Sequence, residues 1–458
     1  MTAWYDKAIF YHMYPLGMTG APFANPYPVS DGAADGTNRD VSADSRMDEL
    51  MQWIPYLESL HISALYIGPL FESSTHGYDT RDFRLIDRRL GTNVSFRSFV
   101  DCCHEHGIRV VVDGVFNHTG REFFAFRDLQ AHRDQSPYAG WYRNVNFGWG
   151  SPLGDSFGYE SWHGIWELPC LNHGNPEVRN YLLDTVRFWV QEFDIDGIRL
   201  DCAGDLSFEF MQELRRLANE IKPEFWLMGE VIHGEYARWV NPQMLHSVTN
   251  YEMHKSIYSA HNDHNYFELA HNVRRLEAVG RDLYTFVDNH DEDRIASKLN
   301  NLANLFPVYQ LLFTLPGIPS VYYGSEWGIE GKRSRTSDEV LRPALNLSDM
   351  LGKAPELASH IAALGKIHTE NDAFHNGSYK ELLLTNRQYA FSRSGEHGTV
   401  ISAVNNDEQP ASISIPLPCA ASDVVSLLPG EIPFSLENGR LSVTLPANGG
   451  AIFKLQEV

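Results

Sequence analysis

Three carboxylic acids, Asp201, Glu230 and Asp291, each close a short segment rich in apolar residues, as expected at the end of a buried strand. A fourth segment, Asp113–His118, also begins where an apolar run ends. Cleavage of a glycosidic bond with retention requires one carboxylate as nucleophile and a second carboxylic acid that protonates the leaving oxygen. A third carboxylate can stabilise the positive charge that develops at the anomeric carbon. The chain therefore carries the acids that this chemistry requires.

A barrel of parallel strands would bring these acids together. Short apolar runs alternate with amphipathic segments from about residue 7 to about residue 370, which is typical of successive strand–helix units. We predict a (β/α)8 TIM barrel, whose active site lies at the carboxyl ends of the strands. The predicted strands are Ala8–Met13, Ala64–Ile67, Arg109–Asp113, Gly197–Asp201, Trp226–Glu230, Ser247–Tyr251, Leu283–Val287 and Ser320–Tyr323. Predicted helices include Met47–Leu60, Pro176–Phe193 with Asn175 as N-cap, and Leu206–Ile221.

Two segments depart from the strand–helix alternation. Residues 119–169 form a long connection rich in glycine and aromatic residues, and a long connection in a compact domain is usually functional. Its aromatic side chains could line a cleft, but packing a small core of their own is the simpler interpretation. Residues 371–458 show short alternating runs, which predict a C-terminal antiparallel β-sandwich. The barrel is then expected to comprise residues 1–118 and 170–370.

Composition excludes several classes of function. The net charge of −22, without a run of Lys or Arg, argues against a nucleic-acid partner. The five cysteines are an odd number and form no C-x-x-C pair, so no disulfide framework is expected. No apolar run reaches the roughly 18 residues of a membrane span, and no signal peptide is evident. We expect a cytoplasmic protein without a membrane partner; its oligomeric state cannot be read from the sequence.

In order and spacing, the four acid-bearing segments resemble the signature segments of the α-amylase family of glycoside hydrolases. They are Asp113–His118, Gly197–Asp201, Phe225–Glu230 and Phe286–Asp291. The resemblance extends over essentially the whole chain, and it implies a barrel with an insert after the third strand and a C-terminal β domain. It also implies that Asp201 is the nucleophile, Glu230 the general acid and then base, and Asp291 the residue that stabilises the transition state.

The resemblance assigns further residues to the substrate. It implies that Tyr78 stacks on the sugar, and that His118 and His290 donate hydrogen bonds to its hydroxyl groups. Arg199 lies two residues before Asp201 on one strand and therefore on the same side, where its charge is expected to keep Asp201 ionised. Taken alone, such residues would be core histidines or a structural ion pair. The other expected substrate-binding residues are Asp79, Asp338 and Arg342.

Some positions depart from the family pattern. Many α-amylases carry Lys-His three and four residues after the nucleophile, where this chain has Gly204 and Asp205. Cys170 stands where an Asp, Glu or Lys is usual. The chain looks closer to the cyclomaltodextrinase, neopullulanase and maltogenic-amylase branch. The resemblance requires no cofactor, and Asn117 is the one residue it offers to calcium, although the loss of the His weakens that expectation.

The leading hypothesis is a retaining hydrolase that cleaves α-1,4-glucosidic bonds of short maltodextrins or cyclomaltodextrins through a covalent glucosyl-enzyme. One alternative is a transglycosylase or sucrose-type glucosyl enzyme of the same family, because the same intermediate can pass to a sugar hydroxyl. Another is a non-catalytic glucan-binding protein, against which the intact Asp201, Glu230 and Asp291 argue. In each case the expected partner is an α-glucan oligosaccharide, and its length and linkage stay open.

Overall fold

Asp201, Glu230 and Asp291 follow the ends of three strands in a ring of eight parallel strands. The computed structural model describes residues 3–29, 44–334 and 337–458. The strands are hydrogen-bonded in the order β10-β9-β8-β5-β2-β1-β12-β11, and a parallel bridge from Thr249 to Tyr284 links the two outer strands. The fold class is therefore confirmed as a (β/α)8 barrel. The strands are β1 Phe10–Met13, β2 Ala64–Ile67, β5 Arg109–Gly114, β8 Gly197–Leu200, β9 Trp226–Gly229, β10 Ser247–Val248, β11 Tyr284–Phe286 and β12 Ile318–Tyr322.

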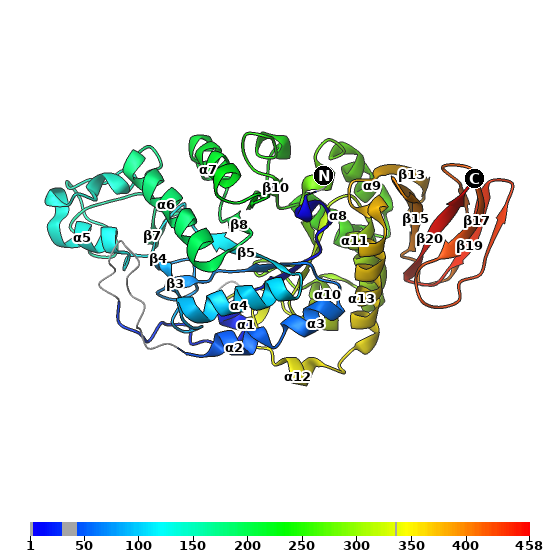
Figure 1. The fold of residues 1–458 in the computed structure, drawn as a ribbon, viewed down its shortest axis with the longest axis horizontal. Coiled ribbons are helices and arrows are strands. Elements are labelled where there is room, and N and C mark those ends of the chain that lie inside the picture. The colour runs from blue at the N-terminus through cyan, green and yellow to red at the C-terminus, as the bar shows by residue number, and fades with distance from the viewer. Residues whose placement is uncertain (1–2, 30–43, 335–336) are drawn as a thin grey trace.

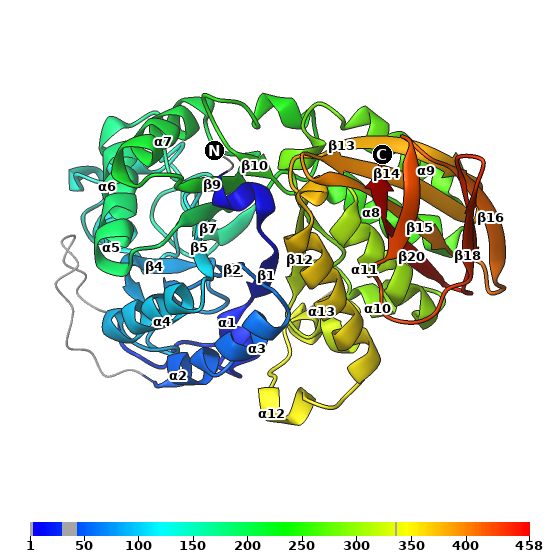
Figure 2. The same cartoon turned by 45° about the vertical axis from the view of Figure 1, so that its right-hand side comes forward.

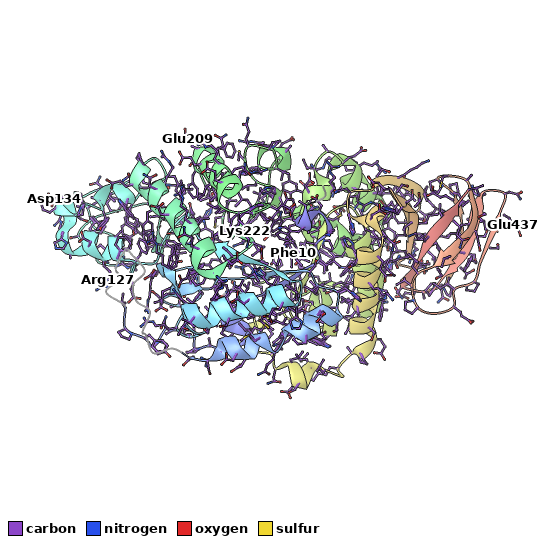
Figure 3. The ribbon with its side chains drawn as sticks, viewed as in Figure 1. Phe10, Arg127, Asp134, Glu209, Lys222 and Glu437 are labelled. Carbon is purple, nitrogen blue, oxygen red and sulfur yellow. The ribbon has the colours of Figure 1, made fainter. Side chains whose placement is uncertain are left out.

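Side chains fill the inside of the barrel at its amino-terminal end. Phe10 is fully buried and its ring lies 4.9 Å from that of Trp226. Tyr284 packs against Phe10 edge to face at 5.4 Å. Figure 3 labels Phe10 within the body of the barrel. Since this end is plugged with aromatic rings, a substrate has access to the barrel axis only from the opposite, carboxyl-terminal end of the strands.

Helices surround the strands, and their ends follow local chemistry (Figures 1 and 2). Asn175 caps α6 by accepting from the backbone of Glu177, as predicted. The predicted helix Met47–Leu60 is instead two helices, because Pro55 fits only the first turn of a helix. The helices are α1 Pro15–Met18, α2 Arg46–Met51, α3 Ile54–Ser59, α4 Asn93–Glu105, α5 Phe124–His132, α6 Pro176–Phe193, α7 Phe208–Ile221, α8 Tyr251–Asn262, α9 Tyr266–Arg275, α10 Ile295–Lys298, α11 Leu305–Thr314, α12 Leu347–Met350 and α13 Pro355–Glu370. None of the described helices combines the length and apolar character needed to cross a bilayer.

The segment between β5 and α6 holds α5 and a small hairpin, β6 Ser161–Trp162 with β7 Ile165–Pro169. Its buried aromatic side chains pack on one another: the ring of Phe126 lies 5.1 Å from Tyr142 and 5.0 Å from Tyr159. Most of its aromatic residues thus build a core of their own, as the simpler interpretation expected. A second hairpin, β3 Phe71–Ser73 with β4 Thr80–Ile86, precedes α4.

The chain ends in two antiparallel sheets, as predicted, with the strand orders β13-β14-β15-β20-β17 and β16-β19-β18. Gln310 on α11 fastens them to the barrel, because its side-chain amide donates to Ser402, Ala403 and Ala451. Figure 1 shows α11 between the barrel and these sheets. Their strands are β13 Ser378–Leu384, β14 Gln388–Gly395, β15 Gly398–Asn405, β16 Ala411–Pro416, β17 Ala421–Ser426, β18 Phe434–Glu437, β19 Arg440–Leu445 and β20 Gly449–Glu457. The domain boundaries given above stay predictions.

Candidate active site

A cleft of about 1640 Å³ opens at the carboxyl-terminal end of the barrel strands. Its lining includes the three acids singled out in the sequence and side chains from the insert, among them Trp162 and Ile165. Of the other predicted site residues, Tyr78, His118, Asp338 and Arg342 also line it. Residues that lie more than 260 positions apart in the sequence therefore line one cleft.

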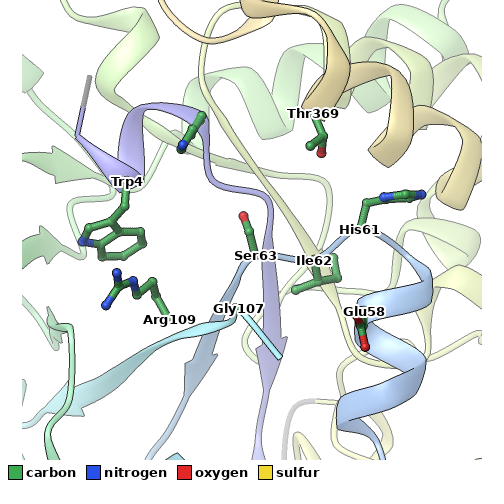
Figure 4. A pocket seen from close by; sticks show the side chains of 9 residues that line it. Trp4, Glu58, His61, Ile62, Ser63, Gly107, Arg109 and Thr369 are labelled. Carbon is green, nitrogen blue, oxygen red and sulfur yellow. The ribbon is translucent and has the colours of Figure 1, made fainter. Parts of the chain in front are cut away.

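A second hollow of about 470 Å³ lies at the other end of the barrel, near the start of β2 and β5 (Figure 4). Its acid and its arginine are already engaged within the protein. Glu58 contacts His106 at 2.8 Å, and Arg109 pairs with Asp196 at 3.0 Å. The larger cleft, where several acids converge, is the better candidate for catalysis.

One buried guanidinium organises three carboxylates. Arg199 and Asp201 are two residues apart along the chain and share a face, so both point toward the barrel axis. Arg199 Nη1 donates to Asp113 Oδ1 at 2.8 Å and to Asp201 Oδ1 at 2.7 Å. Its Nη2 lies 2.9 Å from Glu230 Oε2. The planar fork of arginine suits this task, because its donors can serve acids on neighbouring strands at once.

Asp201 and Glu230 are neighbours in the cleft. A carboxylate oxygen of Asp201 and one of Glu230 lie within 4.8 Å of each other. Burial raises the pKa of Asp201 to about 8; Arg199 opposes this, and Glu230 and Asp113 add to it. Arg199 favours the ionised form of Asp201, as expected, but burial opposes it more strongly. Both acids contact the same guanidinium, so a change of charge on one affects the other.

Asp291 has the opposite electrostatic character. Its carboxylate lies 3.0 Å from His290 Nε2 and 2.8 Å from Arg342 Nη2. Burial alone would raise the pKa of Asp291, but His290 and Arg342 together hold it well below its usual range. Asn289 accepts from the backbone N–H of Asp291 at 2.9 Å and so fixes the turn. The cleft thus contains Asp291, whose ionised form its neighbours favour, and Asp201, whose ionised form burial disfavours.

Tyr78 and the two predicted histidines complete the floor. The Tyr78 hydroxyl lies 2.5 Å from His290 Nε2 and donates to Asp113 Oδ2 at 3.2 Å. His118 Nε2 lies 3.2 Å from the backbone oxygen of Tyr78. Burial lowers the pKa of His118 to about 3, so its ring is neutral and can both donate and accept. These contacts fix the rings before any ligand arrives.

Two predicted residues have contacts of a different kind. Asp79 is buried and its carboxylate accepts from Thr75 N at 3.0 Å and Thr75 Oγ1 at 2.7 Å, within its own loop. Asp338 pairs with Arg333 at 2.7 Å and lies 3.6 Å from Arg342. Asp79 thus shapes the loop that carries Tyr78. Asp338 lies between Arg333 and Arg342 in a row of charged side chains at the edge of the cleft.

The sequence reasoning missed three contacting residues. Tyr66 donates to Asp113 at 2.8 Å, Tyr251 lies 3.5 Å from Glu230, and the thiol of Cys202 lies 3.1 Å from Asp201. Tyr66 lies two residues after buried Ala64 on β2, so the two side chains share the face of the strand that points into the barrel. Cys202 adjoins Asp201, the expected nucleophile, so both had a signal in the sequence.

The surroundings of Asn117 do not suit calcium. Asn117 Oδ1 is buried and has no hydrogen-bond partner in the described part of the chain, which by itself would fit a ligand. Calcium, however, requires six to eight oxygen ligands. Here Cys170 brings a thiol, held nearby through its backbone oxygen, which accepts from Arg143 N at 3.0 Å. The Arg143 guanidinium donates to Leu171 O at 2.9 Å and thus supplies a fixed positive charge to this junction.

Comparison with known proteins agrees with this geometry. The family described as "Alpha amylase, catalytic domain" matches residues 30–351. A maltogenic alpha-amylase of Bacillus acidopullulyticus is 30% identical over 99% of this chain and 78% of its own. A cyclomaltodextrinase of Thermoanaerobacter pseudethanolicus is 29% identical over 89% of this chain and 71% of its own. The solved structure of a Nostoc punctiforme debranching enzyme covers 99% of both chains at 27% identity, with a TM-score of 0.82.

Proposed function

This chain belongs to the α-amylase family of glycoside hydrolases, and we propose that it cleaves α-1,4-glucosidic bonds of short maltodextrins and cyclomaltodextrins through a covalent glucosyl-enzyme. The choice of substrate rests on its likeness to proteins named maltogenic alpha-amylase and cyclomaltodextrinase. The choice of mechanism rests on the arrangement of Asp201 and Glu230.

The spacing of the two acids carries the mechanism. Retaining enzymes hold their carboxyl groups roughly 5–5.5 Å apart because the nucleophile itself reaches the anomeric carbon. Inverting enzymes need roughly 6.5–9.5 Å to admit a water molecule between acid and sugar. The separation of at most 4.8 Å between an oxygen of Asp201 and one of Glu230 supports retention.

The reaction then proceeds in two displacements. Asp201 attacks the anomeric carbon while the bond to the leaving oxygen breaks, and Glu230, acting as general acid, gives that oxygen its proton. Glu230, now a carboxylate, takes a proton from water, and the resulting hydroxide displaces Asp201 from the sugar. Arg199 contacts both acids and so stabilises the negative charge as it moves from one to the other.

The rest of the floor orients the sugar. Asp291, held ionised by His290 and Arg342, supplies negative charge near the developing oxocarbenium ion. His118 is neutral and lines the cleft, so it adds no positive charge there; its Nε2–H, which faces the backbone oxygen of Tyr78, would have to turn to a sugar hydroxyl when substrate binds. Tyr78, fixed by His290, offers the face of its ring to the sugar.

The cleft wall supports a bulky substrate. A Cβ added at Gly204 would meet no atom within 4 Å, so the wall is open where many α-amylases carry Lys. The likeness to a protein named as a debranching enzyme makes α-1,6 cleavage the second candidate. Transfer of the glucosyl group to a sugar hydroxyl is the third, since it uses the same intermediate.

A product profile distinguishes these candidates. Purified protein is incubated separately with maltoheptaose, β-cyclodextrin, pullulan, starch and sucrose, with Asp201→Asn in parallel. Fast hydrolysis of maltoheptaose or β-cyclodextrin, slow attack on starch and an inactive variant support the proposal. Panose or maltotriose from pullulan reports which linkage is cut. Longer products after addition of an acceptor sugar indicate transfer, and products from sucrose alone would refute the substrate assignment.

We further propose that the protein acts in the cytoplasm. All five cysteines are free, which is usual in a reducing compartment. Fractionation of the producing cells tests this: recovery of the protein in an extracellular or periplasmic fraction would contradict it.

A further inference from the structure

Cys202 contacts both catalytic acids. It follows Asp201 directly and turns the chain out of β8 in a left-handed conformation, with φ of 48°. Its backbone N–H donates to Glu230 Oε2 at 3.0 Å. Its thiol donates to Asp201 Oδ2 at 3.1 Å, which is short for a hydrogen bond from sulfur. One residue therefore holds the general acid through its backbone and the nucleophile through its side chain.

The two oxygens of Asp201 are held by different donors. Oδ1 accepts from Arg199, which is also bound to Asp113 and Glu230. Oδ2 accepts from the Cys202 thiol, and no other donor to Oδ2 is found among the described residues. Because Oδ1 is bound to the charged Arg199 and Oδ2 only to a weak thiol donor, we take Oδ2 as the oxygen that meets the anomeric carbon. The thiol thus sits on the attacking oxygen and sets the rotation of the carboxylate.

From this geometry we propose that Cys202 is a positioning residue: its S–H orients the attacking oxygen of Asp201 and favours the ionised nucleophile until the sugar displaces it. The assignment rests on the proposed function, in which Asp201 is the nucleophile. A thiol suits the role because it is a weak donor. A strong donor would hold back the lone pair that must attack, whereas an apolar residue would leave the carboxylate free to rotate.

The thiol is a donor here and not a second nucleophile. Burial, followed by the charges of Asp201 and Glu230, raises the pKa of Cys202 far above its usual range. It therefore stays protonated throughout the working pH range, and its hydrogen remains available to Oδ2. This separates its role from that of reactive cysteines, which lie in electropositive surroundings that favour the thiolate.

The effect on pH dependence has a definite sign. Burial has the largest effect on the pKa of Asp201 and raises it; Arg199 on β8 lowers it, whereas Glu230 after β9 and Asp113 on β5 raise it further. The S–H of Cys202 acts in the same direction as Arg199. Removing this donor makes ionisation of Asp201 harder, so the acid limb of the kcat/KM profile moves to higher pH. A weak hydrogen bond corresponds to a shift of about half a pH unit, or roughly threefold in rate on that limb.

The test compares Cys202→Ala with Cys202→Ser. Both keep a Cβ at the left-handed position, so backbone strain is the same, and only serine keeps a donor. We expect Cys202→Ala to shift the acid limb upward by about half a unit, and Cys202→Ser to restore the position of the limb but with a lower kcat, because the hydroxyl is the stronger donor. Cys102→Ala, which removes a thiol outside the cleft, is the matched control and should leave the limb in place.

Three readouts keep this proposal separate from the proposed function. Infrared difference spectra of the protonated carboxyl band report the ionisation of Asp201 without any substrate. If Cys202→Ala leaves both that titration and the acid limb unchanged, or if Cys202→Ser behaves like Cys202→Ala, the role of Cys202 is refuted while hydrolysis stands. If the wild type cleaves no α-glucan, the proposed function fails, and the infrared titration still decides whether the thiol favours ionised Asp201. Thermal melting of each variant identifies a general loss of folding.

Discussion

Replacing the nucleophile should inactivate the enzyme and stabilise the fold at the same time. The pKa of Asp201 is raised by burial to about 8 from an ordinary 3.8. The unfolded chain releases this proton near pH 4, whereas the folded site retains it until about pH 8. Ionisation therefore favours the unfolded state increasingly as the pH rises between these limits. Asp201→Asn has no such proton, so its stability relative to the wild type should increase over the same range.

The magnitude follows from the width of that interval. Each pH unit contributes about 1.4 kcal/mol, which gives an upper limit near 4 kcal/mol at pH 7. The variant keeps one oxygen for Arg199 but loses the charge of that contact and one of the two acceptors that Asp201 offers to Arg199 and Cys202. We therefore expect a net gain of about 2 kcal/mol at pH 7 and little gain near pH 4.

Asp291→Asn provides a control of opposite sign. Burial would raise the pKa of Asp291, but His290 and Arg342 lower it well below its usual range. A carboxylate with a lowered pKa stabilises the fold above its unfolded pKa, and this stabilisation is lost as the pH falls through the folded value. Asp291→Asn should thus be less stable than the wild type at pH 7, and the deficit should shrink in acid.

The assay is urea unfolding of the wild type and both variants at pH 5, 6, 7 and 8, with turnover of maltoheptaose measured alongside. Two inactive variants whose stabilities diverge in opposite directions would support the electrostatic assignment. A loss of stability in Asp201→Asn at pH 7 and 8, or a gain that does not depend on pH, would refute the raised pKa of Asp201 on which the prediction rests.

Three further predictions concern the supports of the site. Arg199→Lys keeps the charge but cannot reach three carboxylates, so kcat/KM should fall about 100-fold or more with little change in KM; steady-state kinetics measure this, and near-normal activity would contradict it. Arg143→Met should lower the melting temperature by several degrees, whereas EDTA should not; a loss of stability in EDTA that calcium restores would restore the case for a metal at Asn117. Gln310→Ala removes the amide that donates to three buried oxygens, so the free energy of unfolding should fall by about 2–3 kcal/mol while kcat stays unchanged. Calorimetry measures this loss.

The order of helices and strands was predictable because short stretches of sequence determine where each one begins. Asn175 and Pro176 mark the start of α6, and the helix begins at Pro176 as predicted. The predicted strand ends were less accurate where a residue near the end of the strand caps the following helix instead. The predicted strand Ser247–Tyr251 stops at Val248, because Asn250 caps α8 by accepting from Met253 N at 3.1 Å.

The contacts within the site were harder to foresee because they depend on neighbouring strands. That Arg199 and Asp201 share a face follows from strand periodicity. That the same guanidinium reaches Asp113 depends on the register of β5 against β8, where Asp113 lies opposite Arg199. The carboxylate of Asp79 turns toward Thr75 for a similar reason, since the fold of its own loop decides its direction. Local sequence contains neither piece of information.

The shortest strand pairing of the barrel, between β10 and β11, lies beside the candidate active site. Strands β10 and β11 are linked by the bridge from Thr249 to Tyr284, whereas the other neighbouring strands pair along longer stretches. Glu230 lies on one side of this pairing and Asp291 on the other. Tyr251 spans the gap, 3.5 Å from Glu230 and 3.3 Å from the amide nitrogen of Asn289. The barrel is therefore easiest to open between β10 and β11. A small opening there would change the distance between Glu230 and Asp291 before it disturbed the other strand pairs.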